Sequence, residues 1–187
     1  MNETTEHREP KKEKGSGSEA LDWLQCIVSA LVAAILIFTF VARTITVVGS
    51  SMVPTLEQGH LLIVSKLFYQ PKYGDIVVLR KESFMRDPII KRVIATAGQT
   101  VDIDFQEGIV YVDGTALEEP YINDLTREQE DFTEPVTVPE GQIFVMGDNR
   151  NRSTDSRDSR IGCVDARYVI GKAVFRLAPL NVFGRIG

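Results

Sequence analysis

The chain has 187 residues, of which 43% are hydrophobic and 25% are charged, and its formal net charge is -5. This modest negative charge, without a cluster of Lys and Arg among aromatic residues, argues against a nucleic-acid-binding role. Two cysteines and two histidines supply neither a disulfide framework nor zinc-type spacing, so we expect no metal and no other cofactor.

Residues 1–18 are rich in Glu, Lys, Gly and Ser and contain few apolar side chains. A segment of this composition buries too little apolar surface to offset the entropy of folding. We therefore expect a disordered tail.

An uncharged, largely apolar stretch then runs from Trp23 to Ala42. About 20 such residues in a helix span the roughly 30 Å of hydrocarbon in a bilayer. This length predicts a single transmembrane anchor over residues 19–43. A cleavable secretory signal is the alternative, but no small-x-small cleavage pattern precedes Arg43.

Basic residues are distributed unequally on the two sides of this helix. Four of them precede it, whereas Arg43 stands alone until Lys66. The positive-inside rule then places the N-terminus in the cytoplasm and everything after Ala42 outside, as in a single-pass protein of the cell membrane.

Residues 44–187 have the size of one ordinary domain. Their short β-rich runs, separated by Gly and Asp, predict a mostly β fold in which an all-β domain follows the helix. Asp113-Gly114 is typical of a tight hairpin turn. The acidic, polar residues 118–134 predict a long surface excursion. The predicted strands are Thr44–Val48, Leu61–Val64, Asp75–Leu79, Ile89–Thr96, Thr100–Phe105, Ile109–Val112, Gln142–Met146 and Lys172–Leu177.

Ser51 lies in a turn-rich run, eight residues after Arg43. At about 3.3 Å per extended residue, its hydroxyl stands within roughly 26 Å of the end of the apolar segment. This spacing suggests a serine nucleophile close to the membrane surface. Its usual partner, an imidazole, is poorly supplied, because the only histidine after the helix is His60, which a turn-like context predicts to be a solvated loop residue.

A lysine can replace imidazole where burial or nearby positive charge lowers its pKa. In the predicted strand around Lys91, period-2 alternation puts Ile89 and Val93 on the same face as the lysine. Either this face is buried, or Lys91 protects a solvated edge strand. Lys172, between Ile170 and Val174 on its face, is a competitor, whereas Lys81 is an ordinary surface lysine.

A third cluster of polar residues directly follows the apolar run Ile143–Met146. It contains Gly147, Asp148, Asn149, Arg150, Ser153 and two Asp-Ser-Arg triplets, at 155–157 and 158–160. Such a loop can hold other residues in place through hydrogen bonds. A solvated loop or a calcium site would be the alternatives.

Together these segments resemble the bacterial type I signal peptidases, which are membrane-anchored serine proteases with a Ser-Lys dyad. The match runs from about residue 20 to 180 and covers the boxes Ser51–Thr55, Tyr73–Val78, Lys91–Ile94 and Gly147–Arg157. Order and spacing agree, and four boxes together are far more specific than one. The chain departs from the family's Gly-x-Pro-Gly-Asp turn at Ala95–Gln99, and Gly49 stands where some members have a serine that binds the oxyanion.

The resemblance implies that Ser51 is the nucleophile and Lys91 the general base, with Ser153 orienting the amine. It further implies that Asp155 and Arg157 form a supporting ion pair, and that Asp148, Asn149 and Arg150 belong to the same supporting box. The substrate would be a preprotein cleaved after an Ala-x-Ala-like site, presented at the lipid bilayer to an enzyme expected to be a monomer. It would bind as an added strand, in contact with Thr46, Val47, Val48, Met52, Ile89 and Ile90.

Three other functions fit parts of this pattern. A pilus or single-substrate peptidase would share the dyad, and so would a self-cleaving repressor, although the latter carries a DNA-binding domain and lacks an anchor. A non-catalytic, membrane-tethered binding domain would share the fold, but the joint presence of Ser51, Lys91, Ser153 and Asp155 speaks against it.

Overall fold

The computed structural model describes residues 16–40, 42–67, 69–80 and 87–186. It divides the chain into two compact units, with the boundary between Phe40 and Val41. Of the sequence predictions, most of the tail expected over residues 1–18 and the surface lysine Lys81 lie outside the described residues.

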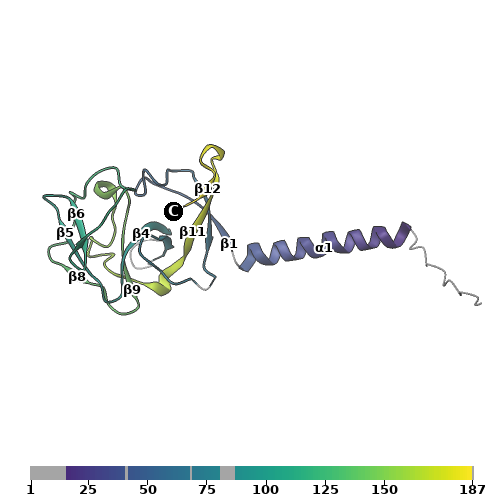
Figure 1. Cartoon of the computed structure of the whole chain (residues 1–187), viewed down its shortest axis with the longest axis horizontal. Helices are drawn as coiled ribbons and strands as arrows, with labels where there is room; N and C mark the ends of the chain where they lie inside the picture. The colour runs from purple at the N-terminus through teal and green to yellow at the C-terminus, as the bar shows by residue number, and fades with distance from the viewer. Residues whose placement is uncertain (1–15, 41, 68, 81–86, 187) are drawn as a thin grey trace, which may run out of the picture. The chain divides into compact units, whose positions relative to one another are not determined.

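The first unit contains helix α1, Ser16–Phe40 (Figure 1). The helix begins within the predicted tail, and Glu19 in its first turn suits the positive end of the helix dipole. It ends before Arg43, the predicted end of the anchor, because Ala42 and Arg43 already lie in strand β1, Ala42–Thr46. There they pair with a neighbouring strand.

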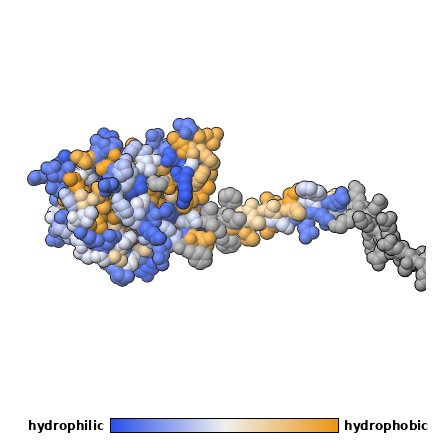
Figure 2. Space-filling model, in the orientation of Figure 1, coloured by the Kyte–Doolittle hydropathy of each residue, from blue (hydrophilic) through white to orange (hydrophobic). Residues whose placement is uncertain are grey.

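Apolar side chains along α1 are exposed, and they form the orange stretches of the helix in Figure 2. The window Glu19–Leu36 has a mean hydropathy of 1.7 and is long enough to cross a membrane. A signal sequence has the same length and composition. The helix therefore meets the requirements of the predicted anchor without excluding the alternative.

The second unit is built from two antiparallel sheets (Figure 1). Among the described residues the larger has the order β1-β2-β11-β3-β4-β9-β10, with β12 paired to β11, and the smaller has the order β7-β6-β5-β8. Strands of the larger sheet after β1 are β2 (Leu61–Ser65), β3 (Ile76–Leu79), β4 (Ile89–Thr96), β9 (Gln142–Met146), β10 (Val164–Asp165), β11 (Val169–Ala178) and β12 (Gly184–Arg185). Those of the smaller are β5 (Thr100–Asp104), β6 (Ile109–Val112), β7 (Thr115–Ala116) and β8 (Val136–Thr137).

The mostly β fold predicted from the sequence is confirmed, and β4, β6 and β9 have the predicted bounds. Missed elements are short: the two-residue strands β7, β8, β10 and β12, and three turns of 3-10 helix. Two or three residues show no hydrophobic period, so pattern alone cannot reveal them. The 3-10 turns are η1 (Arg150–Arg152), η2 (Ala166–Tyr168) and η3 (Leu180–Val182).

Two turns that the sequence singled out are closed by local interactions. Asp113 and Gly114 have φ of 52° and 76°, the left-handed pair of a tight hairpin between β6 and β7. The unusual Ala95–Gln99 segment turns through Gly98 at φ 84°. The Gln99 side-chain oxygen accepts from the Thr96 N–H at 2.9 Å, which closes this turn locally.

Buried aliphatic residues form three clusters around the sheets. One joins Met52 and Leu56 to β2, β3, β4 and β11, so the loop that carries Ser51 is packed into the core. Another lies between the larger and smaller sheets, where Phe132 contacts Phe105 and Phe144 edge to face with centroids 6.0 Å apart. The serine loop and the segment around Phe132 therefore both pack against buried hydrophobic residues.

Residues 118–134, here called the strap, form the surface excursion that their polarity predicts: they contain no helix or strand, and most of them are exposed. Phe132 is nevertheless buried in the core, and Thr126 is completely buried. Asn151 accepts two backbone N–H groups of the strap, from Arg127 and Glu128, and donates to the carbonyl of Leu125. Polar residues thus hold the strap to the loop after β9, an attachment that hydrophobic periodicity does not register.

We predict that Phe132→Ala lowers the free energy of unfolding by about 3 to 5 kcal/mol, because it empties a site between two aromatic rings. Phe183→Ala is the matched control. That ring is 56% exposed and packs edge to face on Phe175, so its loss should cost about 1 kcal/mol. Urea unfolding of both variants measures the difference, and equal losses would contradict the packing of the strap into the core.

Candidate active site

Ser51 begins a series of turns, residues 51–55, between β1 and β2. Met52 and Leu56 anchor this loop in the core, and the Leu56 N–H donates to the Met52 carbonyl at 2.8 Å. From the other side, the Asn149 N–H donates to the Ser51 carbonyl and its side-chain amide donates to Ser50, both at 3.0 Å. The serine is thereby fixed at its backbone while its side chain stays partly exposed.

Gly147 lets the serine loop and the loop after β9 approach each other closely. A Cβ at this position would lie 2.5 Å from the Ser51 carbonyl oxygen and 2.2 Å from Ser153 Oγ. Neither separation is possible for real atoms, so only glycine fits here.

Asp148 joins three segments by charge-assisted hydrogen bonds. Its carboxylate accepts from Arg92 Nε at 2.8 Å and Nη2 at 2.7 Å, and from Thr55 Oγ1 at 2.5 Å. Because Arg92 follows Lys91 on β4 and Thr55 follows Ser51 in its loop, this bidentate ion pair fixes the lysine strand relative to the serine loop.

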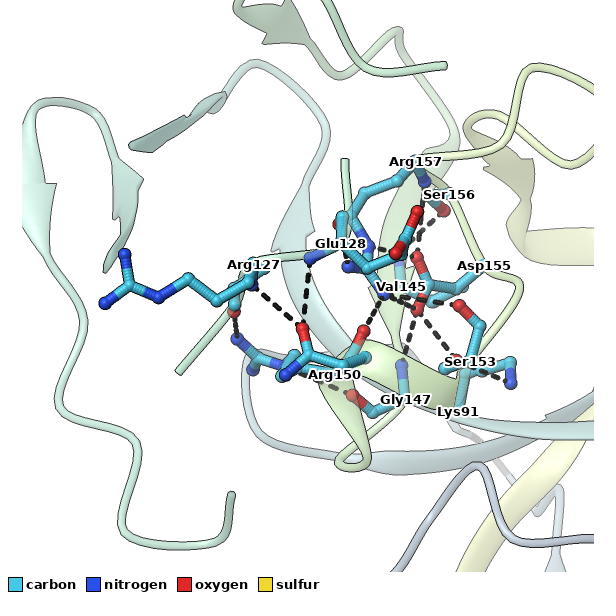
Figure 3. A network of polar contacts seen from close by, with 12 residues as sticks. Lys91, Arg127, Glu128, Val145, Gly147, Arg150, Ser153, Asp155, Ser156 and Arg157 are labelled. Carbon is cyan, nitrogen blue, oxygen red and sulfur yellow. Dashed lines mark hydrogen bonds and ion pairs between the residues drawn. The ribbon is translucent and has the colours of Figure 1, made fainter. Parts of the chain in front are cut away.

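Lys91 lies on β4, which is a central strand between β3 and β9. Its side chain is 3% exposed, so the edge-strand alternative is wrong and the buried-face alternative is correct. Nζ donates to Ser153 Oγ at 3.0 Å, and Ser153 in turn donates to Asp155 at 2.8 Å (Figure 3). Because the proton of the Ser153 hydroxyl is directed to Asp155, its oxygen acts as an acceptor for the Lys91 amine.

Asp155 is completely buried and fully paired. Its carboxylate accepts from Arg157 Nε and Nη2 at 2.9 Å and from the Gly147 N–H at 2.9 Å. These donors hold the pKa of Asp155 below its usual value although burial opposes this. The carboxylate thus remains charged next to the lysine (Figure 3).

Burial lowers the pKa of Lys91 to about 8. The negative charge of Asp155 opposes this shift, the positive charge of Arg157 adds to it, and Glu130 and Asp148 oppose it more weakly. A sizeable fraction of the amine is therefore neutral near neutral pH and able to accept a proton.

Ser51 and Lys91 line the same groove, which has a volume of about 410 Å³. The groove is also lined by every residue that the sequence assigned to substrate contacts: Thr46, Val47, Val48, Met52, Ile89 and Ile90. Its remaining lining residues were not anticipated, namely Ile45, Gly49, Asp87, Pro88 and Thr154. Thr154 could have been found from its position between Ser153 and Asp155.

Arg150 connects this site to the strap. Its guanidinium is fully buried, donates to the Gly147 carbonyl at 3.1 Å, and forms an ion pair with Glu119. It also donates to Thr126 Oγ1 at 3.0 Å. Sequence reasoning missed Glu119 and Thr126, because the partner of an arginine in a distant segment leaves no local pattern.

The other two candidates, His60 and Lys172, do not line the groove and have hydrogen-bond or ion-pair partners of their own. His60 is buried, not solvated as predicted, because its Nδ1 accepts the Glu57 N–H at 3.1 Å and closes a turn. Burial lowers its pKa. Lys172 forms an ion pair with Asp75 and does not line the groove.

Of the two Asp-Ser-Arg triplets, the first supplies the residues that contact Ser153. In the second, Asp158 pairs with Arg160, whose side chain is largely exposed. Among the described residues, no group of three or more His, Cys, Asp or Glu side chains is arranged to hold a metal ion.

Comparison with known proteins gives consistent matches. The family model described as signal peptidase, peptidase S26, matches residues 20–178. The probable signal peptidase I-1 of Synechocystis is 42% identical over 86% of this chain and 84% of that protein. Signal peptidase I T of Bacillus subtilis is 35% identical over 97% of both. A crystal structure of a signal peptidase I from Enterococcus faecalis, 32% identical, matches 56% of this chain and 97% of that chain with a TM-score of 0.43.

We predict that the Lys91 amine titrates at about pH 8. The signal to follow is the 13Cε resonance of this lysine, which the spectrum of Lys91→Arg identifies by its disappearance. Titration near the ordinary lysine pKa of about 10.4 would show that burial does not act on this amine as inferred.

Proposed function

This chain belongs to the signal peptidase family, peptidase S26, and we propose that it removes signal peptides from exported preproteins with Ser51 as nucleophile and Lys91 as general base. The observation that carries the proposal is the shared groove, which is lined both by the partly exposed Ser51 and by the buried Lys91. Family membership supports signal-peptide removal as the overall reaction.

The hydrogen bonds around Lys91 support a general-base role for a neutral amine. Ser153 gives its only hydroxyl proton to Asp155, so it can only accept from Nζ. A neutral amine that donates to Ser153 keeps its lone pair for another proton. We propose that this lone pair removes the proton of Ser51.

Acyl transfer then follows in two stages. Ser51 Oγ attacks the scissile carbonyl carbon, and its proton moves to Lys91 Nζ. Collapse of the tetrahedral intermediate breaks the C–N bond, and the Lys91 ammonium protonates the leaving amine. In the second stage a water molecule gives a proton to the neutral amine and attacks the acyl carbon. The bond between this carbon and Ser51 Oγ then breaks, the Lys91 ammonium returns the proton to Ser51 Oγ, and the signal peptide leaves as a carboxylic acid.

Developing negative charge on the carbonyl oxygen requires a nearby donor. Gly49 has no hydroxyl to offer, and so we assign this role to the backbone N–H of Ser51. The backbone of the serine loop is suited to it, because Asn149 and the buried Met52 hold that loop in place before substrate arrives.

The substrate is proposed to bind as an extended strand beside β1. This strand is an edge of the larger sheet. Val47 directs its N–H and C=O toward His60 and Gly59, at 2.8 and 2.9 Å, so the alternating geometry turns the backbone groups of Thr46 and Val48 the other way. Those groups can pair with a peptide, while the apolar groove walls admit only small side chains, as in an Ala-x-Ala-like site.

We further propose that α1 anchors the enzyme in the cell membrane, with the N-terminus in the cytoplasm and residues 44–187 outside. Its apolar length and the basic residues before it support this arrangement. Preproteins and the bilayer are the partners that such an arrangement implies.

Ser51→Ala and Lys91→Ala should each reduce cleavage of a preprotein to the level of the uncatalysed control, because one removes the nucleophile and the other the base. His60→Ala should retain most of the activity, since its imidazole serves the Glu57 turn. Cleavage assays on purified, folded variants provide the measurement. Substantial activity in Lys91→Ala would contradict the dyad and direct attention to Lys172, and inactivity of the parent toward every preprotein would favour a binding domain.

Residues 1–42 should be dispensable for cleaving short peptides but not for efficient cleavage of membrane-inserted preproteins. All the proposed catalytic groups lie in the second unit, and a shared bilayer raises the effective concentration of the cleavage site. Comparing kcat/KM for the two substrate types, with and without these residues, measures the effect.

Topology is tested separately by adding protease to intact cells. Digestion of residues 44–187 from outside is the expected result. Full protection, with digestion only after the cells are opened, would place the domain in the cytoplasm and contradict a secretory processing role.

A further inference from the structure

Glu130, in the strap, has a backbone conformation that is unusual for its residue type. Its φ is 51°, in the left-handed region. Asp113 shares this conformation in its hairpin turn. Glu130 lies in a different turn, which the Phe132 N–H closes by donating to the Gln129 carbonyl at 3.1 Å. A non-glycine residue keeps a positive φ in such a turn when its surroundings hold the turn in place.

The surroundings impose it from both sides. Before Glu130, the carbonyl of Glu128 accepts from Arg157 Nη1 at 2.6 Å (Figure 3). After it, Asp131 accepts from the N–H and hydroxyl of Ser159, at 3.1 and 2.6 Å. Both clamps belong to the segment 157–159, so the turn is held against the residues that follow Asp155.

The carboxyl group of Glu130 is thereby directed toward the catalytic loop. It faces the backbone N–H of Asp155 and lies within electrostatic reach of Arg157, Asp158 and Arg160. Its Oε2 atom is buried and has no hydrogen-bond partner among the described residues.

A buried carboxylate oxygen without a hydrogen-bond partner is unfavourable, and so is a carboxylate close to a second carboxylate. Burial and Asp155 together raise the pKa of Glu130. The turn accounts for the left-handed backbone, but it does not account for the carboxylate oxygen without a partner. This oxygen points to a role at the neighbouring site.

We propose that Glu130 is a positioning residue for the reaction: its carboxylate stands behind Asp155, competes with it for Arg157, and helps to set the fraction of Lys91 that is neutral. This inference rests on the proposed function, because the neutral amine matters only if Lys91 is the base. The charged groups that act on Lys91 are Asp155, Arg157, Glu130 and Asp148, in that order of influence.

The sign of the effect follows from charge. A negative Glu130 favours the ammonium form of Lys91, so Glu130→Gln should favour the neutral amine. The acid limb of the pH profile, over which kcat/KM rises as Lys91 loses its proton, should then move to lower pH. At pH 7, below that limb, the variant should cleave about two to five times faster than the parent, and above pH 9 the two should be equal. The full chain in detergent, with a signal-peptide substrate, is suitable for the measurement.

Two further variants separate charge from backbone effects. Glu130→Gly also removes the carboxylate but adopts a left-handed φ without strain, so it should keep the turn and shift the limb in the same direction. Glu134→Gln, an exposed carboxylate of the same strap, should leave the limb in place. A purely structural role for Glu130 would instead change thermal stability and lower kcat at every pH.

The 13Cε titration of Lys91 provides a readout that does not depend on catalysis. In Glu130→Gln and Glu130→Gly the midpoint should move to lower pH. Unchanged midpoints and limbs in both variants would overturn the inference and leave the dyad intact. A parent enzyme with no acid limb, or an active Lys91→Ala, would instead overturn the proposed function.

Discussion

The burial of one amine, that of Lys91, governs the architecture around it. An ammonium removed from water loses hydration that the interior cannot return in full, so burial shifts the group toward its neutral form. The negative charge of Asp155 opposes that shift, and Arg157, which pairs with Asp155 through two nitrogens, adds to it. The ion pair is itself buried and requires further partners. Arg157 finds them in the carbonyl groups of Glu128, Arg150 and Ser153, which draws the strap into the site.

The serine loop is held by a different set of interactions that converge on the same loop after β9. Asp148 links Thr55 to Arg92, Asn149 holds the backbone of residues 50 and 51, and Gly147 allows the two loops to touch. Three consecutive residues thus hold the loop of Ser51, the proposed nucleophile, while Ser153 and Asp155 support Lys91, the proposed base. The relative placement of these two residues is therefore decided within one short segment of chain, supported by the buried strand β9.

Much of this arrangement could be predicted from the sequence, because its signals are local. Alternation around Lys91 left a buried face and a solvated edge as the two alternatives, of which the structure shows the first, and the dense polar cluster after Ile143–Met146 suggested a supporting loop. Long-range polar pairing could not be predicted. The strap was predicted as a surface excursion, but its attachment was not, since nothing near Glu119 in the chain shows that Arg150 will pair with it. His60 was expected to be solvated for a related reason, because a hydrogen bond that a side chain accepts within its own turn leaves no signal in the local pattern.

Edge strand β1 has one further consequence. A sheet edge with free backbone groups is a site at which a second chain can add, and proteins usually protect such edges with charge, proline or a bulge. Here the edge continues into Val48, whose side chain is 85% exposed, directly beside an apolar groove. If this edge accepts a peptide as proposed, it is also open to another copy of the same domain. An extended peptidomimetic bound along this edge would cover its free backbone groups and fill the groove. Inhibitors of this shape should therefore also keep the isolated domain soluble at high concentration, because they block pairing between copies.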